Sequence, residues 1–201
     1  MRKSIPTILE TKQLPHFAYL ERDKITVPVT AEDFDTAVKQ IKAAKLVGFD
    51  TESKPVFEKG AVNGGPHVVQ FATQDRAYIF QLSNVERHNP LVYLLAADDI
   101  KKVGFDLASD RKLLLKKFGV SPRSFVDLCP MFKRRGYRNT VGVRAAVAIL
   151  FNQQFYKSKH TTMSDWSNPL LSETQISCAA NDAYGALCVY FKILSDAEIV
   201  A

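Results

Sequence analysis

Residues 177–187 read SCAANDAYGAL, and this stretch poses the central question about the chain. Small residues that pack closely surround Asp182, so the segment is predicted to be a buried helix with a carboxylate in its middle. A carboxylate in an apolar helix is costly unless something pairs with it. Cys178 precedes Asp182 by one helical turn and is therefore expected on the same face.

Working outward, this helix is predicted to begin at Ser172, where Ser-Glu-Thr-Gln forms a capping box. Upstream, LVGFDTE at 46–52 has the pattern of a buried strand whose apolar run ends in charge. HVVQFAT at 67–73 and RAYIFQL at 76–82 are separated by a short polar turn, which predicts a hairpin. Three consecutive strands are therefore expected to form a meander.

The remaining elements alternate between strand and helix. Thr30 is predicted to cap a helix that ends near Lys45, and the chain from Met131 onward is predicted to be mostly helical. The other predicted elements are helices at 91–97 and 107–118 and short strands at 101–105 and 124–128. A meander followed by this alternation predicts an α/β fold, with a mixed sheet of five to six strands and helices on both faces.

The length and composition indicate one domain with an arm. The chain has 201 residues, of which 46% are hydrophobic, enough for a sizeable core. Residues 1–27 contain prolines and lack sustained periodicity, so they are expected to lie on a domain formed by residues 28–201. The formal charge of +6 makes a polyanionic partner plausible.

Other features of the composition indicate an intracellular protein. The three cysteines have no CxxC spacing, which favours a reducing compartment over a zinc site or a disulfide framework. The basic N-terminus lacks the apolar core of a signal peptide, and no apolar run approaches a membrane span. We therefore expect a cytoplasmic protein with no membrane partner, and the nucleus remains open.

Four acidic residues stand where isolated charge is unfavourable. Asp50 and Glu52 are two apart at the end of a strand and so are expected on one face of the sheet. Asp110 falls among leucines on the predicted helix at 107–118, and Asp182 lies in the helix described above. Taken singly, each carboxylate also has an ordinary explanation. Asp50 and Glu52 fit a solvated strand end, and Asp110 fits an exposed helix residue near Arg111. Asp182 fits a partner for a buried Lys or Arg.

Taken together, the four carboxylates favour a divalent-metal site. Mg²⁺ and Mn²⁺ prefer carboxylate and water ligands, and several converging carboxylates need about two such cations to be neutralised. Paired cations activate a water and stabilise the leaving oxygen of a phosphodiester. In this interpretation the partner of Asp182 is a metal ion and not a side chain.

Three stretches of the sequence form a recognisable set: VGFDTES at 47–53, VGFDLASDRKLLLKKFG at 103–119 and CAANDAYGALCVY at 178–190. They resemble, in order, the motifs of the DEDD superfamily of 3′–5′ exonucleases, in the branch of ribonuclease D and the Werner syndrome helicase exonuclease domain. The similarity runs from about Leu46 to Tyr190 and includes GGPHVVQFAT and DWSNPLLSETQ between the motifs. One motif alone is a weak signal, whereas three in order are strong.

The resemblance implies a ribonuclease H-like fold, with a 3′–5′ exonuclease domain at residues 28–201, and two divalent cations, Mg²⁺ or Mn²⁺. It implies that Asp50, Glu52 and Asp182 ligate the water-activating cation, that Asp50 bridges to the second, and that Asp110 supports the second directly or through water. The implied reaction is hydrolysis of single-stranded or recessed nucleic-acid 3′ ends to nucleoside 5′-monophosphates. The motifs do not distinguish a DNA substrate from an RNA substrate, since that discrimination rests on 2′-hydroxyl contacts that they do not encode.

The sequence departs from the family at the position that orients the attacking water. This branch normally has a tyrosine four residues before the last aspartate, and the sister branch a histidine five residues before it. These positions are Cys178 and Ser177 here. The substitution predicts a weakened exonuclease, and it leaves open a catalytically silent nucleic-acid-binding module or a phosphohydrolase of small nucleotides.

Basic residues near the predicted site suggest a path for the nucleic acid. Lys157, Lys159 and His160 precede the last helix, where related enzymes approach the substrate strand, and they are preferred over the group at 133–138. We expect them to contact the phosphate backbone. A solvated basic surface explains both groups equally well.

Overall fold

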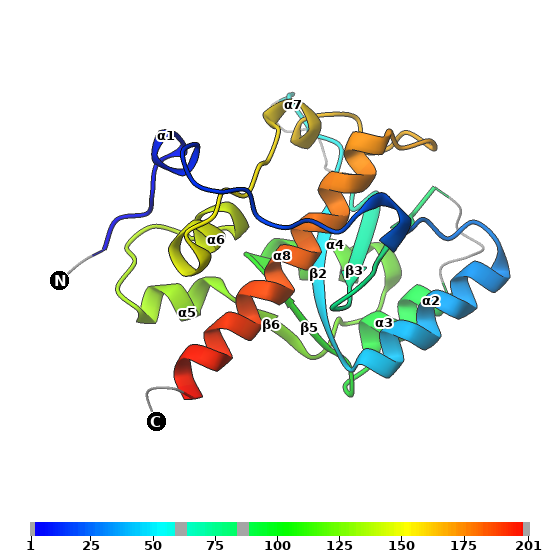
Figure 1. The fold of residues 1–201 in the computed structure, drawn as a ribbon. Coiled ribbons are helices and arrows are strands. Elements are labelled where there is room, and N and C mark those ends of the chain that lie inside the picture. Colours follow the sequence, from blue (N-terminus) through cyan, green and yellow to red (C-terminus); the bar gives the residue numbers. More distant parts are fainter. Residues whose placement is uncertain (1–2, 59–63, 84–88, 199–201) are drawn as a thin grey trace.

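The structure, a computed structural model, describes residues 3–58, 64–83 and 89–198 (Figure 1). Six strands form one sheet in the order β1-β4-β3-β2-β5-β6. Their bounds are β1 (Ile25–Thr26), β2 (Leu46–Glu52), β3 (Val68–Ala72), β4 (Ala77–Gln81), β5 (Lys101–Gly104) and β6 (Phe125–Asp127). β2, β3 and β4 are antiparallel neighbours, whereas β5, β6 and β1 pair in parallel. The predicted mixed sheet is confirmed.

Eight α-helices and one 3-10 helix are assigned in the described ranges. They are α1 (Ile8–Thr11), η1 (Arg22–Lys24), α2 (Ala31–Ala44), α3 (Asn89–Ala96), α4 (Leu107–Phe118), α5 (Cys129–Arg134), α6 (Val143–Phe151), α7 (Lys159–Thr162) and α8 (Glu173–Glu198). Thr30 caps α2 through a capping box with Asp33, as predicted. The predicted Ser172 cap is also present, with Gln175 as its partner. None of these helices has the length and apolarity that crossing a bilayer requires.

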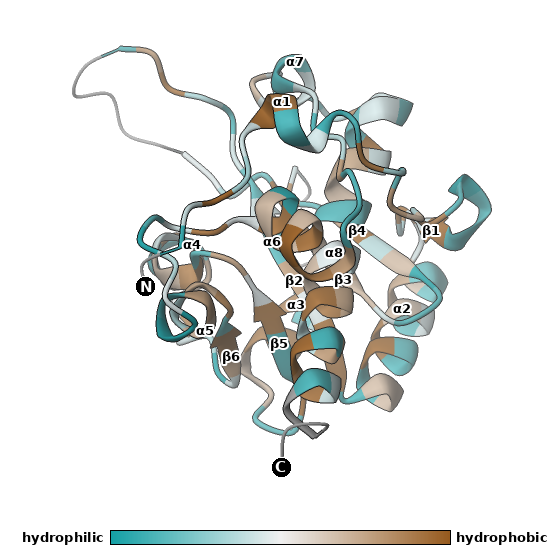
Figure 2. Cartoon of the chain, turned by 60° about the vertical axis from the view of Figure 1, so that its left-hand side comes forward, coloured by the Kyte–Doolittle hydropathy of each residue, from teal (hydrophilic) through white to brown (hydrophobic). Residues whose placement is uncertain are grey.

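Helices cover both faces of the sheet, as predicted. α2, α3 and α4 bury one face of β2, β3 and β4 in a core that contains Ile41, Phe49 and Leu94. α8 lies across the other face and shares cores with β3, β5 and α6. In Figure 2 the apolar residues concentrate on the strands and on the helix faces turned toward them. This arrangement places α8 directly against β2, the strand that ends in Asp50, Thr51 and Glu52.

Two segments have features that the sequence did not predict. The chain from Met131 onward is mostly helical, as predicted, chiefly because of the long α8; before it, α5, α6 and α7 are short and are separated by irregular chain. Gly136 (φ 91°) and Asn152 (φ 53°) adopt left-handed backbone conformations that interrupt a helix. The segment at 1–27 crosses α8 in Figure 1 and also supplies β1, which pairs with the edge of β4. The sheet therefore takes one edge strand from the expected arm.

Candidate active site

Three of the predicted carboxylates meet at one point. Asp50 and Glu52 alternate with Thr51 on β2 and so project from the sheet face that α8 covers. Asp182 of α8 joins them, and carboxylate oxygens of all three residues lie within 4.8 Å of one another. Glu52 is 8% exposed and Asp182 only 2%. The cluster is therefore an inner feature of the fold and not a solvated strand end.

Gly48 explains how α8 comes close enough to complete the cluster. A Cβ atom at this position would lie 1.9 Å from the Ala183 carbonyl oxygen, far inside van der Waals contact. Gly48 precedes Asp50 by two residues on the same face, and Ala183 follows Asp182 directly. The glycine in β2 and the small residues around Asp182 thus form one close strand–helix contact.

Burial and mutual repulsion favour the protonated form of these carboxyls over the charged form. Burial raises the pKa of Asp50 to about 8, with Asp182 and Asp110 adding to the rise. Burial likewise raises the pKa of Glu52 to about 9, and the charge of Asp50 contributes. Without a bound metal ion, this site resists full ionisation near neutral pH.

The raised pKa values predict how pH affects the metal-free protein. A carboxyl with a raised pKa in the folded state stabilises the fold below its unfolded pKa of about 4. That stability is lost as the pH rises through about 8 and 9, the folded values for Asp50 and Glu52. In EDTA, the fall in unfolding free energy between about pH 5 and pH 8 should therefore be steeper for the parent protein than for Glu52→Gln. Exposed Glu58→Gln should retain the parent slope, and equal slopes in all three proteins would contradict this account.

The partner of Asp182 in this structure is a side chain, contrary to the expectation that it would be a metal ion alone. Lys157 Nζ lies 2.7 Å from Asp182 Oδ2. Burial acts to lower the pKa of the Lys157 ammonium, but the charges of Asp182, Asp50 and Glu52 outweigh burial and raise it. In this structure the Lys157 ammonium pairs with Asp182, and its predicted contact with a phosphate stays a prediction. Lys159 and His160 are exposed on α7.

Asp110 lies beside the cluster but not within it. It projects from α4, on the opposite side of the sheet from α8, and accepts a hydrogen bond from Thr51 Oγ1. Burial raises the pKa of Asp110, whereas this hydrogen bond lowers it. Its charge contributes to the raised pKa of Asp50, so the two carboxyls are electrostatic neighbours. The hydrogen bond therefore links Asp110 to Thr51, the strand residue between Asp50 and Glu52.

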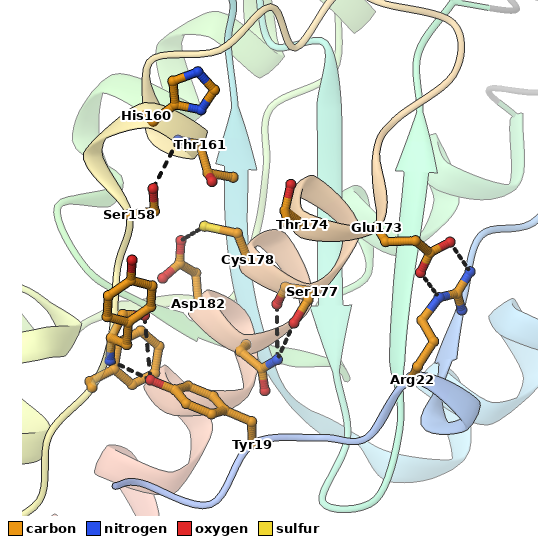
Figure 3. Close-up of a pocket in the computed structure, with 13 residues that line it drawn as sticks. Tyr19, Arg22, Ser158, His160, Thr161, Glu173, Thr174, Ser177, Cys178 and Asp182 are labelled. Atoms are coloured by element: carbon orange, nitrogen blue, oxygen red, sulfur yellow. Dashed lines mark hydrogen bonds and ion pairs between the residues drawn. The ribbon is translucent and has the colours of Figure 1, made fainter.

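The other side of the cluster opens into a pocket of about 700 Å³. Cys178 and Asp182 lie on its α8 wall, His160 and Thr161 come from α7, and Tyr19 comes from the N-terminal segment (Figure 3). Cys178 Sγ lies 3.8 Å from Asp182 Oδ2 and donates to it. Burial raises the pKa of the Cys178 thiol, and the charge of Asp182 adds to the rise. The thiol is therefore a neutral donor and not a thiolate nucleophile.

The donor set fits divalent cations that prefer oxygen ligands. Asp182 Oδ1 is buried and has no hydrogen-bond partner among the described residues, so one oxygen of the most buried carboxylate remains available. The other members of the cluster are also carboxylates, the ligand type of Mg²⁺ and Mn²⁺. Repulsion among them, seen in the raised pKa values, is the property that a bound cation relieves.

Sequence reasoning missed three residues around this site. Gln70 pairs with Asp50 across β2 and β3, is fully buried, and has no hydrogen-bond partner for its amide in the described part of the chain. Its position inside the apolar run HVVQFAT was a usable signal. Asn181 accepts a hydrogen bond from Leu20 N, and Tyr19 Oη accepts one from Tyr156 N. Nothing local in the sequence predicts these last two contacts.

A mixed sheet covered on both faces, with an acidic centre at the end of an inner strand, defines a ribonuclease H-like domain. The chain belongs to the 3′–5′ exonuclease family, whose sequence model matches residues 25–198. The family and fold inferred from the three motifs are thereby confirmed.

Two curated relatives show the extent of the similarity. The bifunctional 3′–5′ exonuclease/ATP-dependent helicase WRN of Mus musculus is 31% identical over 150 residues, which are 74% of this chain and 11% of that protein. Ribonuclease D of Gluconacetobacter diazotrophicus is 30% identical over 172 residues, which are 84% of this chain and 42% of that protein. The chain thus matches less than half the length of either relative.

Solved structures show the same fold at lower identity. The Nibbler EXO domain of Aedes aegypti has a TM-score of 0.76 at 18% identity, with 92% of this chain and 94% of that chain covered. Escherichia coli RNase D has a TM-score of 0.73 at 19% identity, with coverage of 87% and 45%. A complex of Trypanosoma brucei RNase D with RNA U12 has a TM-score of 0.74 at 18% identity, with coverage of 85% and 62%.

Proposed function

We propose that this chain is a metal-dependent 3′–5′ exonuclease that hydrolyses single-stranded or recessed nucleic-acid 3′ ends to nucleoside 5′-monophosphates. The observation that carries the proposal is the convergence of Asp50, Glu52 and Asp182 beside an open pocket, in a chain of this family. A domain that only binds nucleic acid gains nothing from such costly clustering of like charges.

The residues divide the work according to their positions. Asp50, Glu52 and Asp182 would hold the cations, and Asp110 would support the second cation directly or through water. Mg²⁺ or Mn²⁺ bound there supplies an activated water and stabilises the leaving oxygen. The pocket beside Cys178 offers room for the terminal nucleotide, with Tyr19 and Tyr156 among its walls. Cys178 donates a weak hydrogen bond where a phenol would reach further.

The decisive experiment determines from which end the oligonucleotide is shortened, and whether metal is needed. DNA and RNA oligonucleotides labelled at either end are incubated with Mg²⁺, with Mn²⁺ or with EDTA. The proposal expects a ladder that shortens from the 3′ end only when metal is present. Cleavage in EDTA, or release from the 5′ end, would refute it.

A catalytically silent nucleic-acid-binding module is the second candidate. Two observations favour it: the thiol of Cys178 stands where the family has a water-orienting tyrosine, and Lys157 already neutralises Asp182. In that case the oligonucleotides bind but remain intact with either metal. The same experiment therefore separates the two functions.

Lys159 provides a test of the nucleic-acid path. Its side chain is exposed on α7, next to His160 in the wall of the pocket. If it contacts a phosphate, Lys159→Ala should weaken binding similarly for all sequences and reduce the slope of log affinity against log salt by about one. Fluorescence anisotropy over a salt series measures that slope. An unchanged slope would identify Lys159 as a solvated surface charge.

A further inference from the structure

The ammonium of Lys157 occupies a cluster whose chemistry suits divalent cations. Its Nζ lies 2.7 Å from Asp182 Oδ2, and its side chain is 28% exposed whereas that of Asp182 is 1% exposed. In each of the other lysine–carboxylate pairs in the described ranges, both side chains are more exposed, for example Lys54 with Asp165 at 52% and 49%. Lys157 is thus set apart from the ordinary surface lysines of this basic chain.

The backbone that carries Lys157 is held in place by the N-terminal segment. Phe17 N donates to Gln154 O at 2.9 Å, and Gln154 N donates to Pro15 O at 2.7 Å. Tyr156 N donates to Tyr19 Oη, and the Phe155 ring packs against the rings of Phe17 and Tyr19. These contacts direct the lysine that follows toward α8. Its place in the cluster is therefore built into the fold.

An ammonium and divalent cations cannot share these carboxylates without a large electrostatic cost. The cluster offers three carboxylates, or four with Asp110, and two divalent cations carry four positive charges. Adding the charge of Lys157 leaves an excess of positive charge in a poorly solvated site, where repulsion is strong. The flexible four-carbon stem of lysine permits the ammonium to leave while the backbone stays fixed.

A phosphate oxygen is a suitable new partner for the displaced ammonium. Tyr156 and Ser158, the neighbours of Lys157, line the pocket that opens beside Asp182. A nucleic-acid strand that enters this pocket brings a phosphodiester charge next to the carboxylates. Lysine binds such a group as a point charge without demanding a fixed geometry.

We propose that Lys157 exchanges partners: it neutralises Asp182 in the metal-free protein and moves to a phosphate of the substrate when divalent cations occupy the carboxylates. This inference rests on the proposed function. It makes the binding of metal and of oligonucleotide cooperative, because metal alone must break the Lys157–Asp182 pair without giving the ammonium a new partner. Linkage then requires each ligand to raise the affinity for the other by the same factor.

The experiment measures Mn²⁺ binding by isothermal titration calorimetry, with and without a phosphorothioate oligonucleotide that resists cleavage. Without oligonucleotide, Lys157→Met should bind Mn²⁺ about tenfold more tightly than the parent protein, since its competitor is gone. The oligonucleotide should tighten Mn²⁺ binding by about tenfold in the parent protein and much less in Lys157→Met. Lys157→Arg retains the charge and should remain close to the parent.

The matched control is Lys192→Met. It removes the ion pair between Lys192 Nζ and Asp196 Oδ1, which are 2.9 Å apart near the C-terminal end of α8, the helix that carries Asp182. It should bind Mn²⁺ as the parent protein does, with and without oligonucleotide. Circular dichroism checks that each variant is folded. Equal or weaker Mn²⁺ affinity in folded Lys157→Met would overturn the exchange while leaving the proposed exonuclease intact. A parent protein that neither binds Mn²⁺ nor cleaves would instead refute the proposed function.

Discussion

Asp50→Asn is expected to reduce turnover on an oligonucleotide by about a thousandfold or more. In the proposed mechanism Asp50 would help to hold the cations, and an amide cannot supply its negative charge. Losing several kcal/mol of transition-state stabilisation from misplaced cations corresponds to this factor. The fold should survive, because an amide oxygen still accepts the hydrogen bond that Thr51 N gives to Asp50 Oδ1 at 2.9 Å.

Single-turnover rates at saturating Mn²⁺ measure this effect, so that weaker metal affinity alone does not explain it. In EDTA near pH 8, the same variant should unfold at a higher temperature than the parent, since a buried carboxyl with a raised pKa has been removed. Asp35→Asn, on the exposed face of α2, is the matched control and should change neither quantity. A folded Asp50→Asn variant with near-parent turnover would refute the assignment of the carboxylates.

The sequence specified the strands and main helices because their signals are local. LVGFDTE and HVVQFAT are apolar runs bounded by turns or charge, and Thr30 and Ser172 cap helices through side chains three residues away. The breaks between the short helices α5, α6 and α7 were not predicted, and left-handed residues such as Gly136 divide the chain there. β1 was missed because its two residues are defined only by pairing with β4.

The candidate site divides in the same way. Strand alternation places Asp50 and Glu52 on one face, and helical spacing places Cys178 beside Asp182, so these relations follow from the sequence. Lys157 meets Asp182 across 25 residues of chain, and Tyr19 meets Tyr156 across 137. Contacts of this kind depend on how the N-terminal segment crosses α8, which no local pattern encodes. The sequence therefore predicted that these carboxylates lie together, but not that the Lys157 ammonium pairs with one of them.

Cys178→Tyr is expected to raise turnover by about 10- to 1,000-fold, the usual contribution of a positioned proton-handling group. The thiol reaches only Asp182 Oδ2, at 3.8 Å, and it is a weak donor. A phenol at the same position extends several ångströms further along the face of α8 that borders the pocket. The pocket of about 700 Å³ beside Cys178 offers space for the ring (Figure 3).

Cys178→Ala separates this gain from chemistry performed by the thiol itself. Because burial keeps the Cys178 thiol protonated, with a raised pKa, we expect the alanine variant to cleave at close to the parent rate. Single-turnover rates on a 3′-labelled oligonucleotide at saturating Mg²⁺ and Mn²⁺ compare the three proteins. Loss of activity in Cys178→Ala would mean that the thiol takes part in the reaction. A folded Cys178→Tyr variant that is no faster than the parent would show that the hydroxyl does not reach the attacking water, and that the weak step lies elsewhere in the site.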